Sequence, residues 1–176
     1  MRKPVQRHPP EWHSNVAVER LPHGRPRIIR QTLTPCSSIW PSIAGSVVAW
    51  TQEGTCPGHL GSDVILYNLK TSKTVEITHN HGSSEAVTNG KYVAWEQGPA
   101  GSGRFDYGAI MLRNLKSGKV NPISRRPVDK SDPHCAKGRN SIETCADWPV
   151  ISDDVAAWMD AGQLDIVARD LRTGTE

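Results

Sequence analysis

Ile43-Ala44-Gly45-Ser46-Val47-Val48-Ala49-Trp50 is the stretch that decides the fold, because the chain repeats it twice more. It returns as VTNGKYVAW at residues 87–95 and as ISDDVAAW at residues 151–158. In each copy, two apolar runs flank a short segment of turn-forming residues, a pattern that favours a β-hairpin. Each copy therefore predicts two antiparallel strands, the second of which ends in Ala-Trp.

Two further segments follow each hairpin and complete the repeat. The first is Tyr-Asn-Leu-Lys-Thr-Ser at residues 67–72, which matches residues 113–118 and 169–174. The second is a short run with a similar ending at residues 75–78 and 120–124. We therefore expect a third strand before the 67–72 segment and a fourth strand after it. Helical periodicity is absent from the pattern of apolar residues, which favours an all-β fold.

A repeat of roughly 40–50 residues with four strands is typical of a β-propeller blade. One blade cannot bury both faces of its sheet, so neighbouring blades stack on each other. We therefore expect Trp50, Trp95 and Trp158 to fill the core between blades rather than to serve as ligand platforms. The sequence predicts blades of four antiparallel strands, about three of them, in an incomplete propeller.

The repeat also divides the chain into units. Net charge is +3, and residues 1–30 hold seven basic and two acidic side chains. We expect a disordered basic tail at 1–14, a half blade at 15–34, blades at 39–80 and 84–124, a long loop at 125–147 and a partial blade at 148–176. Closed propellers typically have four to eight blades, so we expect further blades or a protein partner to cover the open edges.

The repeat resembles the TolB-type β-propeller repeat, also called WD40-like. The resemblance covers roughly residues 15–176 and rests on the Ala-Trp hairpin, on DVILYNLKTS at residues 63–72 and on Glu-Ile-Thr at residues 76–78. It implies a propeller that makes protein contacts in the periplasm or at the cell surface, or the non-catalytic domain of a prolyl-oligopeptidase-like peptidase. The chain departs from the family in lacking its usual Ser-Pro-Asp-Gly turn and its usual number of blades.

Four cysteines, Cys36, Cys56, Cys135 and Cys145, show no Cys-x-x-Cys spacing, which argues against the common zinc and thioredoxin motifs. Their number allows three ways of forming two disulfides. The expected strand order places the first two in neighbouring loops of one face and the last two in one loop, which favours Cys36–Cys56 and Cys135–Cys145. Disulfides would indicate a periplasmic or extracellular protein, and the alternative is four free thiols in the cytosol.

Long insertions are expected on one face of the propeller, where the loops between strands two and three meet those between blades. Loops on a rigid scaffold are where binding usually resides. The polar side chains expected on this binding face are His59, His79, His81, Arg104, Asp106 and His134.

The sequence favours a binding module over an enzyme. It contains no G-x-S-x-G elbow, no H-E-x-x-H motif and no Walker loop, so we expect no catalytic residue and no cofactor. His79 and His81 are weak metal candidates, because an H-x-H at a strand end can place two imidazoles on one side. Since propeller-fold lyases that act on pectic oligosaccharides use histidines with a divalent metal, a metal-assisted polysaccharide lyase or a peptidase-associated propeller is the alternative.

Membrane spanning and nucleic-acid binding are not expected. The longest apolar run is the five residues 155–159, far shorter than the roughly 20 that a membrane helix needs. Binding to single-stranded nucleic acid needs exposed aromatic rings among basic residues, whereas most tryptophans belong to the repeat. Trp12 and Trp40 are the exceptions, and Trp40-Pro41 matches Trp148-Pro149.

The N-terminus lacks the apolar stretch of a signal peptide. We therefore expect either that the protein is made without a signal peptide or that the chain lacks its true beginning. The leading interpretation is a non-catalytic, TolB-like propeller segment of a larger exported or cell-surface protein. It would bind a protein or another ligand through its loop-rich face.

Overall fold

The computed structural model describes residues 13–22, 24–33, 36–56, 59–98, 109–124, 146–160 and 165–175. These residues form four antiparallel sheets, which follow one another along the chain. Their strands are β1 (His13–Val18), β2 (Arg27–Leu33), β3 (Cys36–Ala44), β4 (Val47–Cys56), β5 (His59–Asn68), β6 (Lys73–Glu76), β7 (Ser83–Thr88), β8 (Tyr92–Gln97), β9 (Ala109–Asn114), β10 (Val120–Pro122), β11 (Ala146–Ser152), β12 (Val155–Asp160) and β13 (Asp165–Asp170). In this part of the chain, no helix is long and apolar enough to cross a membrane.

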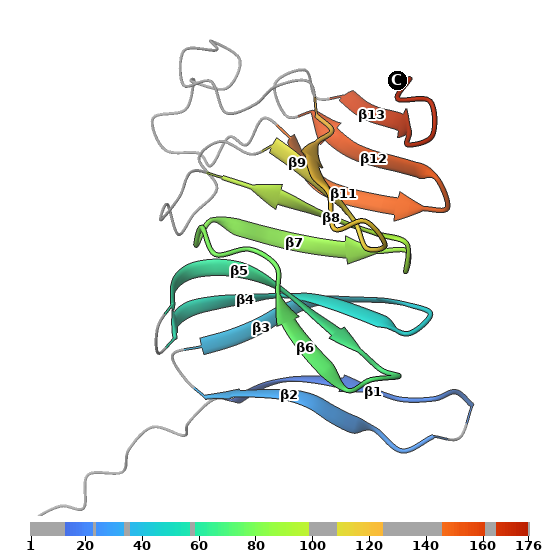
Figure 1. Cartoon of the computed structure of the whole chain (residues 1–176). Coiled ribbons are helices and arrows are strands. Elements are labelled where there is room, and N and C mark those ends of the chain that lie inside the picture. The colour runs from blue at the N-terminus through green and yellow to red at the C-terminus, as the bar shows by residue number, and fades with distance from the viewer. Residues whose placement is uncertain are drawn as a thin grey trace, which may run out of the picture.

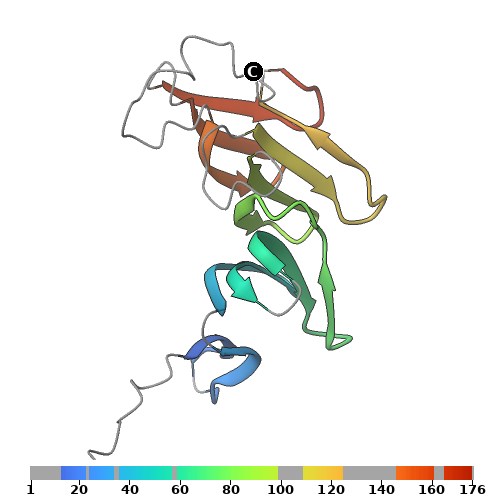
Figure 2. The same ribbon diagram turned by 90° about the vertical axis from the view of Figure 1, so that its left-hand side faces the viewer.

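The sheets have the strand order of propeller blades. The two complete sheets run β3-β4-β5-β6 and β7-β8-β9-β10, so each strand pairs with the next one in the chain. A pair, β1-β2, precedes them, and a three-stranded sheet, β11-β12-β13, follows. Figure 1 shows the four sheets stacked in chain order, and the turned view in Figure 2 shows the same succession. The prediction of an all-β, partial propeller is confirmed.

The three repeated tryptophans lie between successive sheets, as the sequence predicts. Trp50 packs with Val16 of the preceding sheet. Trp95 of β8 packs with Val64 of β5, and Trp158 of β12 packs with Ile110 of β9. All three indoles are buried. Each blade therefore uses the same second-strand position to bury its face against the blade before it.

Equivalent third-strand positions face the following blade. Val64 pairs with Thr51, and the same register places Ile110 opposite Glu96 and Ile166 opposite Met159. Val64 and Ile110 are both 0 % exposed, because the next sheet covers them. Ile166, on the last described sheet, is 75 % exposed. Within the described residues, the repeat thus ends on an uncovered apolar face.

The repeated segments at residues 67–72, 113–118 and 169–174 form the same turn in each blade. The side-chain oxygen of Asn68 accepts hydrogen bonds from the backbone N–H groups two and three residues later, at 2.9 and 3.2 Å. Asn114 and Asp170 make the same pair of bonds in their own turns. An Asx side chain that caps the backbone in this way stabilises a tight turn. This bond explains why Asn or Asp occupies this position in all three copies.

In two blades, the hydroxyl group at the end of the repeat accepts a hydrogen bond from a backbone N–H of the third strand. The Val64 N–H donates to Thr78 Oγ1 at 2.8 Å, and the Ile110 N–H donates to Ser124 Oγ at 3.0 Å. Thr78 also donates to Asp63 Oδ1 at 3.0 Å. These bonds satisfy buried backbone donors after the fourth strand has ended.

Candidate functional site

The first strand of each blade, β3, β7 or β11, carries a β-bulge at the same place. In each strand, two residues stand opposite a single tryptophan of the second strand, Trp50, Trp95 or Trp158. The leading bulge residues are Trp40, Glu85 and Trp148, with φ angles of 51°, 53° and 51°. Bulges bend a strand and re-aim its side chains, and they occur often beside binding sites.

A positive φ angle is strained for a residue that carries a side chain. It costs of order 1–3 kcal/mol and persists only where the surrounding structure enforces it. Here the same conformation recurs at Trp40, Glu85 and Trp148 because each residue lies in the same bulge. The bulge thus gives three successive blades a side chain that leaves the regular alternation of its strand.

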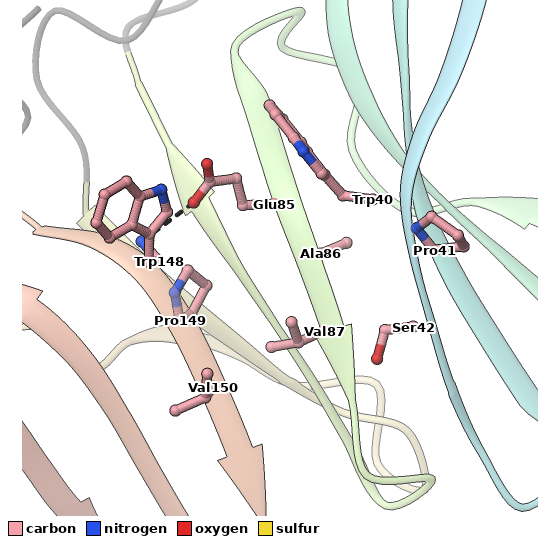
Figure 3. Close-up of a pocket in the computed structure, with 9 residues that line it drawn as sticks. All are labelled: Trp40, Pro41, Ser42, Glu85, Ala86, Val87, Trp148, Pro149 and Val150. Carbon is pink, nitrogen blue, oxygen red and sulfur yellow. Dashed lines mark hydrogen bonds between the residues drawn. The ribbon is translucent and has the colours of Figure 1, made fainter.

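These side chains line a groove of about 420 Å³ along the first strands. Figure 3 shows β7 in the middle of the groove, with β3 on one side and β11 on the other. The groove is lined by Trp40, Pro41, Ser42, Glu85, Ala86, Val87, Trp148, Pro149 and Val150.

Two partly exposed indoles flank a carboxylate in this groove. Trp40 is 47 % exposed and Trp148 is 63 % exposed, unlike the buried tryptophans of the core. In the view of Figure 3, the Glu85 side chain lies between them. A proline follows each indole, so apolar surface extends from both sides of Glu85. Such a surface can take an apolar or aromatic group of a ligand.

Glu85 is held in place from the neighbouring blade. The backbone N–H of Trp148 donates to Glu85 Oε2 at 3.1 Å and to Asp147 Oδ1 at 2.8 Å. One amide of β11 thereby links the bulges of the second and third blades.

A cluster of three carboxylates lies beside the groove, where the second and third blades meet. Glu85, Glu96 and Asp147 each offer one oxygen, and these atoms all lie within 4.8 Å of one another. Glu96 is 1 % exposed, and its Oε1 has no hydrogen-bond partner among the described residues. Thr51 and Met159 occupy the position of Glu96 in the other two blades. Among the three blades, this position therefore holds a carboxylate in the second blade alone.

Burial and the neighbouring Asp147 raise the pKa values of Glu85 and Glu96. Burial, together with the charge and hydrogen bonding of Asp147, raises the pKa of Glu96 to about 10. Burial and a hydrogen bond with Asp147 raise the pKa of Glu85 to about 7. Both shifts disfavour the charged form, as expected when like charges share a site of low polarity.

The structure holds His79 and His81 through different carboxylates. His79 Nδ1 lies 3.0 Å from Glu76 Oε1 on an exposed surface. His81 Nδ1 lies 2.7 Å from Oδ2 of the buried Asp63, and the His81 backbone N–H donates to Oδ1 of the same residue at 3.2 Å. The set with metal-ligand spacing among the described residues contains neither histidine. Their role in metal binding stays a prediction.

Several other predicted site residues lie outside the described part of the chain. These are Arg104, Asp106, His134, Cys135 and Cys145, together with the side chains of His59 and Cys56. Cys36 is buried and disulfide-bonded, which agrees with an oxidised cysteine at this place. The two pairings expected from the sequence stay predictions.

Sequence reasoning sought the site on the loops and did not predict Glu85, Glu96, Asp147 or Trp148. One signal for the groove was visible, because Trp-Pro occurs twice outside the Ala-Trp copies. The signal for Glu96 was weaker. It consists of a carboxylate directly after Ala-Trp, at a position that the propeller model buries.

Comparison with known proteins supports the fold. No family model matches the chain, and no curated protein matches it. Among solved structures, TolB from Acinetobacter baumannii aligns with a TM-score of 0.59 at 13 % identity over 91 % of this chain and 36 % of TolB.

Two further structures align less well. An oligogalacturonate lyase in complex with manganese gives a TM-score of 0.47 at 12 % identity over 82 % of this chain and 37 % of the lyase. The acylaminoacyl peptidase of Pyrococcus horikoshii gives 0.42 at 11 % identity, over 75 % of this chain and 24 % of the peptidase. The chain thus has a TolB-like β-propeller fold and spans about a third of the length of TolB.

Proposed function

We propose that this chain is a non-catalytic propeller segment that binds a protein partner through the groove of its first strands. The observation that carries the proposal is the pair of exposed indoles, Trp40 and Trp148, held by strained bulges on a rigid scaffold. Tryptophan is enriched among the residues that dominate binding energy at protein interfaces.

The groove favours an extended segment that inserts an apolar or aromatic side chain. Trp40-Pro41 and Trp148-Pro149 form two apolar walls, and Ala86 and Val87 of β7 lie between them. Because the bulges fix the backbone beneath the indoles, little conformational freedom is lost when a ligand binds. This placement differs from the loop-rich face expected from the sequence, and it uses residues that the structure describes.

An exported or cell-surface location fits this function. Cys36 is disulfide-bonded, and disulfides persist in oxidising compartments. The likeness to TolB extends to the fold, and the location forms part of the proposal. The alternative of a metal-assisted lyase depends on His79 and His81, which contact separate carboxylates.

Peptide selection tests the proposal without a known partner. The immobilised 176-residue chain is used to select binders from a display library of random peptides. Their affinities are then measured by isothermal titration for wild type, Trp40→Ala and Trp148→Ala. Each substitution is expected to weaken binding by about 30-fold, equivalent to a loss of about 2 kcal/mol at an interface anchor.

Ile166→Ala is the matched control, because it removes an exposed apolar side chain away from the groove. Selected peptides should bind this variant as they bind wild type. Peptides that lose affinity with Ile166→Ala and keep it with both tryptophan variants would place binding on the open blade face and contradict the proposal.

A further inference from the structure

The carboxylates of Glu85, Glu96 and Asp147 meet at the junction of two blades. They come from three strands, β7, β8 and β11, and their oxygens lie within 4.8 Å of one another. None of the three has a basic side chain as an ion-pair partner in the described part of the chain. Three carboxyl groups thus meet at one junction with no basic side chain from these residues beside them.

Glu96 is the member of the cluster that most needs a partner. It is 1 % exposed, and no described residue forms a hydrogen bond with its Oε1. A buried polar oxygen without a partner is costly, and such an atom in a folded protein calls for an explanation such as a bound ion. In the third blade, Met159 occupies the same position and brings no polar oxygen there.

The spacing and chemistry of the cluster fit a calcium ion. Calcium binds oxygen ligands at about 2.3–2.6 Å, so two ligands on opposite sides of one ion lie at most about 5 Å apart. The 4.8 Å limit on the three carboxylate oxygens satisfies this condition. The donor set contains oxygen alone, which suits a hard cation better than zinc or copper. Glu85 and Asp147 are only half-buried, which leaves room for water among the remaining ligands.

We propose that Glu85, Glu96 and Asp147 bind one Ca²⁺ ion that joins the second and third blades. The ion bridges β7 and β8 to β11. It also fixes the β11 bulge, because the Trp148 N–H donates to two of its carboxylate ligands. This site goes beyond the proposed function and does not depend on it.

Thermal unfolding of the whole chain tests the proposal directly. The protein is treated with EDTA, dialysed, and unfolded in buffer containing CaCl2 at up to about 10 mM, well above the dissociation constants of extracellular calcium modules. We expect a saturable rise in Tm of about 5–10 °C at a hundred times the dissociation constant. A Tm that does not respond to calcium over this range would overturn the proposal.

Two variants separate this site from nonspecific binding. Glu96→Gln preserves the shape of the side chain and removes its charge, and it should abolish the rise in Tm. Asp153→Asn removes an exposed turn carboxylate and should leave the rise intact. An equal rise in wild type and Glu96→Gln would place calcium elsewhere and overturn the proposal.

Terbium luminescence provides a readout that does not depend on stability. Tb³⁺ replaces Ca²⁺ at oxygen sites, and Trp148 lies directly beside the cluster, where it can transfer excitation energy to the ion. We expect emission that calcium displaces and that Trp148→Phe reduces while the calcium-induced rise in Tm remains. If Glu96→Gln fails to fold, wild-type terbium emission that calcium does not displace would refute the site by itself.

Discussion

Replacing Ile110 and Ile166 separately by alanine tests whether the blades stack as described. The two residues occupy the same third-strand position in consecutive blades, opposite Glu96 and Met159. Ile110 is 0 % exposed beneath the next sheet, whereas Ile166 is 75 % exposed. Because the same atoms are deleted at both positions, effects on the unfolded chain largely cancel in the comparison.

The expected magnitudes follow from burial. The substitution removes three carbon groups, at about 0.8 kcal/mol for each one withdrawn from water, so Ile110→Ala loses about 2.4 kcal/mol of transfer free energy. The cavity left behind raises the total loss to about 3–4 kcal/mol. About a quarter of Ile166 is shielded, so Ile166→Ala is expected to cost about 0.6 kcal/mol.

Urea unfolding followed by tryptophan fluorescence measures the difference. Trp158 packs against Ile110, so its emission reports the loss of this blade contact. We expect the unfolding midpoint of Ile110→Ala to fall by about 1–2 M urea. The midpoint of Ile166→Ala should fall by only a few tenths of 1 M urea. Equal losses in free energy for both variants would refute the described stacking, or show that another surface covers Ile166 in solution.

Three further outcomes are expected. Thr78→Val removes the acceptor of the buried Val64 N–H and one of the hydrogen bonds that Asp63 Oδ1 accepts, so urea unfolding should show a loss of about 1–3 kcal/mol. Asn114→Ala removes the turn cap and should cost about 0.5–1 kcal/mol in the same assay, less than Thr78→Val. In EDTA, unfolding free energy should fall by up to about 1.4 kcal/mol per unit between about pH 5 and 9, because the pKa of Glu96 is raised to about 10 and the folded chain keeps a proton that the unfolded chain releases. Glu96→Gln should flatten this slope, and a wild-type stability that rises with pH across the window would contradict the assignment.

The architecture was predictable because each blade repeats the same short sequence motifs at the same places in its sheet. The Ala-Trp ending marks the inter-blade core, and Asn68 with its counterparts marks the turn that leads to the fourth strand. These features depend on residues close together in the chain, so a repeated sequence reveals them. Trp50, Trp95 and Trp158 accordingly lie where the sequence predicts.

The groove and the acidic cluster were harder to predict because they depend on contacts between blades. Asp147 follows Glu85 by more than sixty residues, and no local pattern relates the two. The bulges were also hidden in the sequence, since Trp40, Glu85 and Trp148 share a backbone conformation but not a residue type. A register shift that places two residues opposite one tryptophan follows from sheet geometry rather than from periodicity.

One equivalent position of the second strand holds a different type of residue in each blade, and this difference has a consequence for engineering. Thr51, Glu96 and Met159 are equivalent in the three blades, yet only Glu96 meets acidic neighbours from two other strands. A chimaera that exchanges the second and third modules would separate Glu96 from Asp147 and set each carboxylate against an unrelated surface. Shuffled libraries of these modules should therefore recover the natural succession at this joint more often than at the joint between the first and second modules.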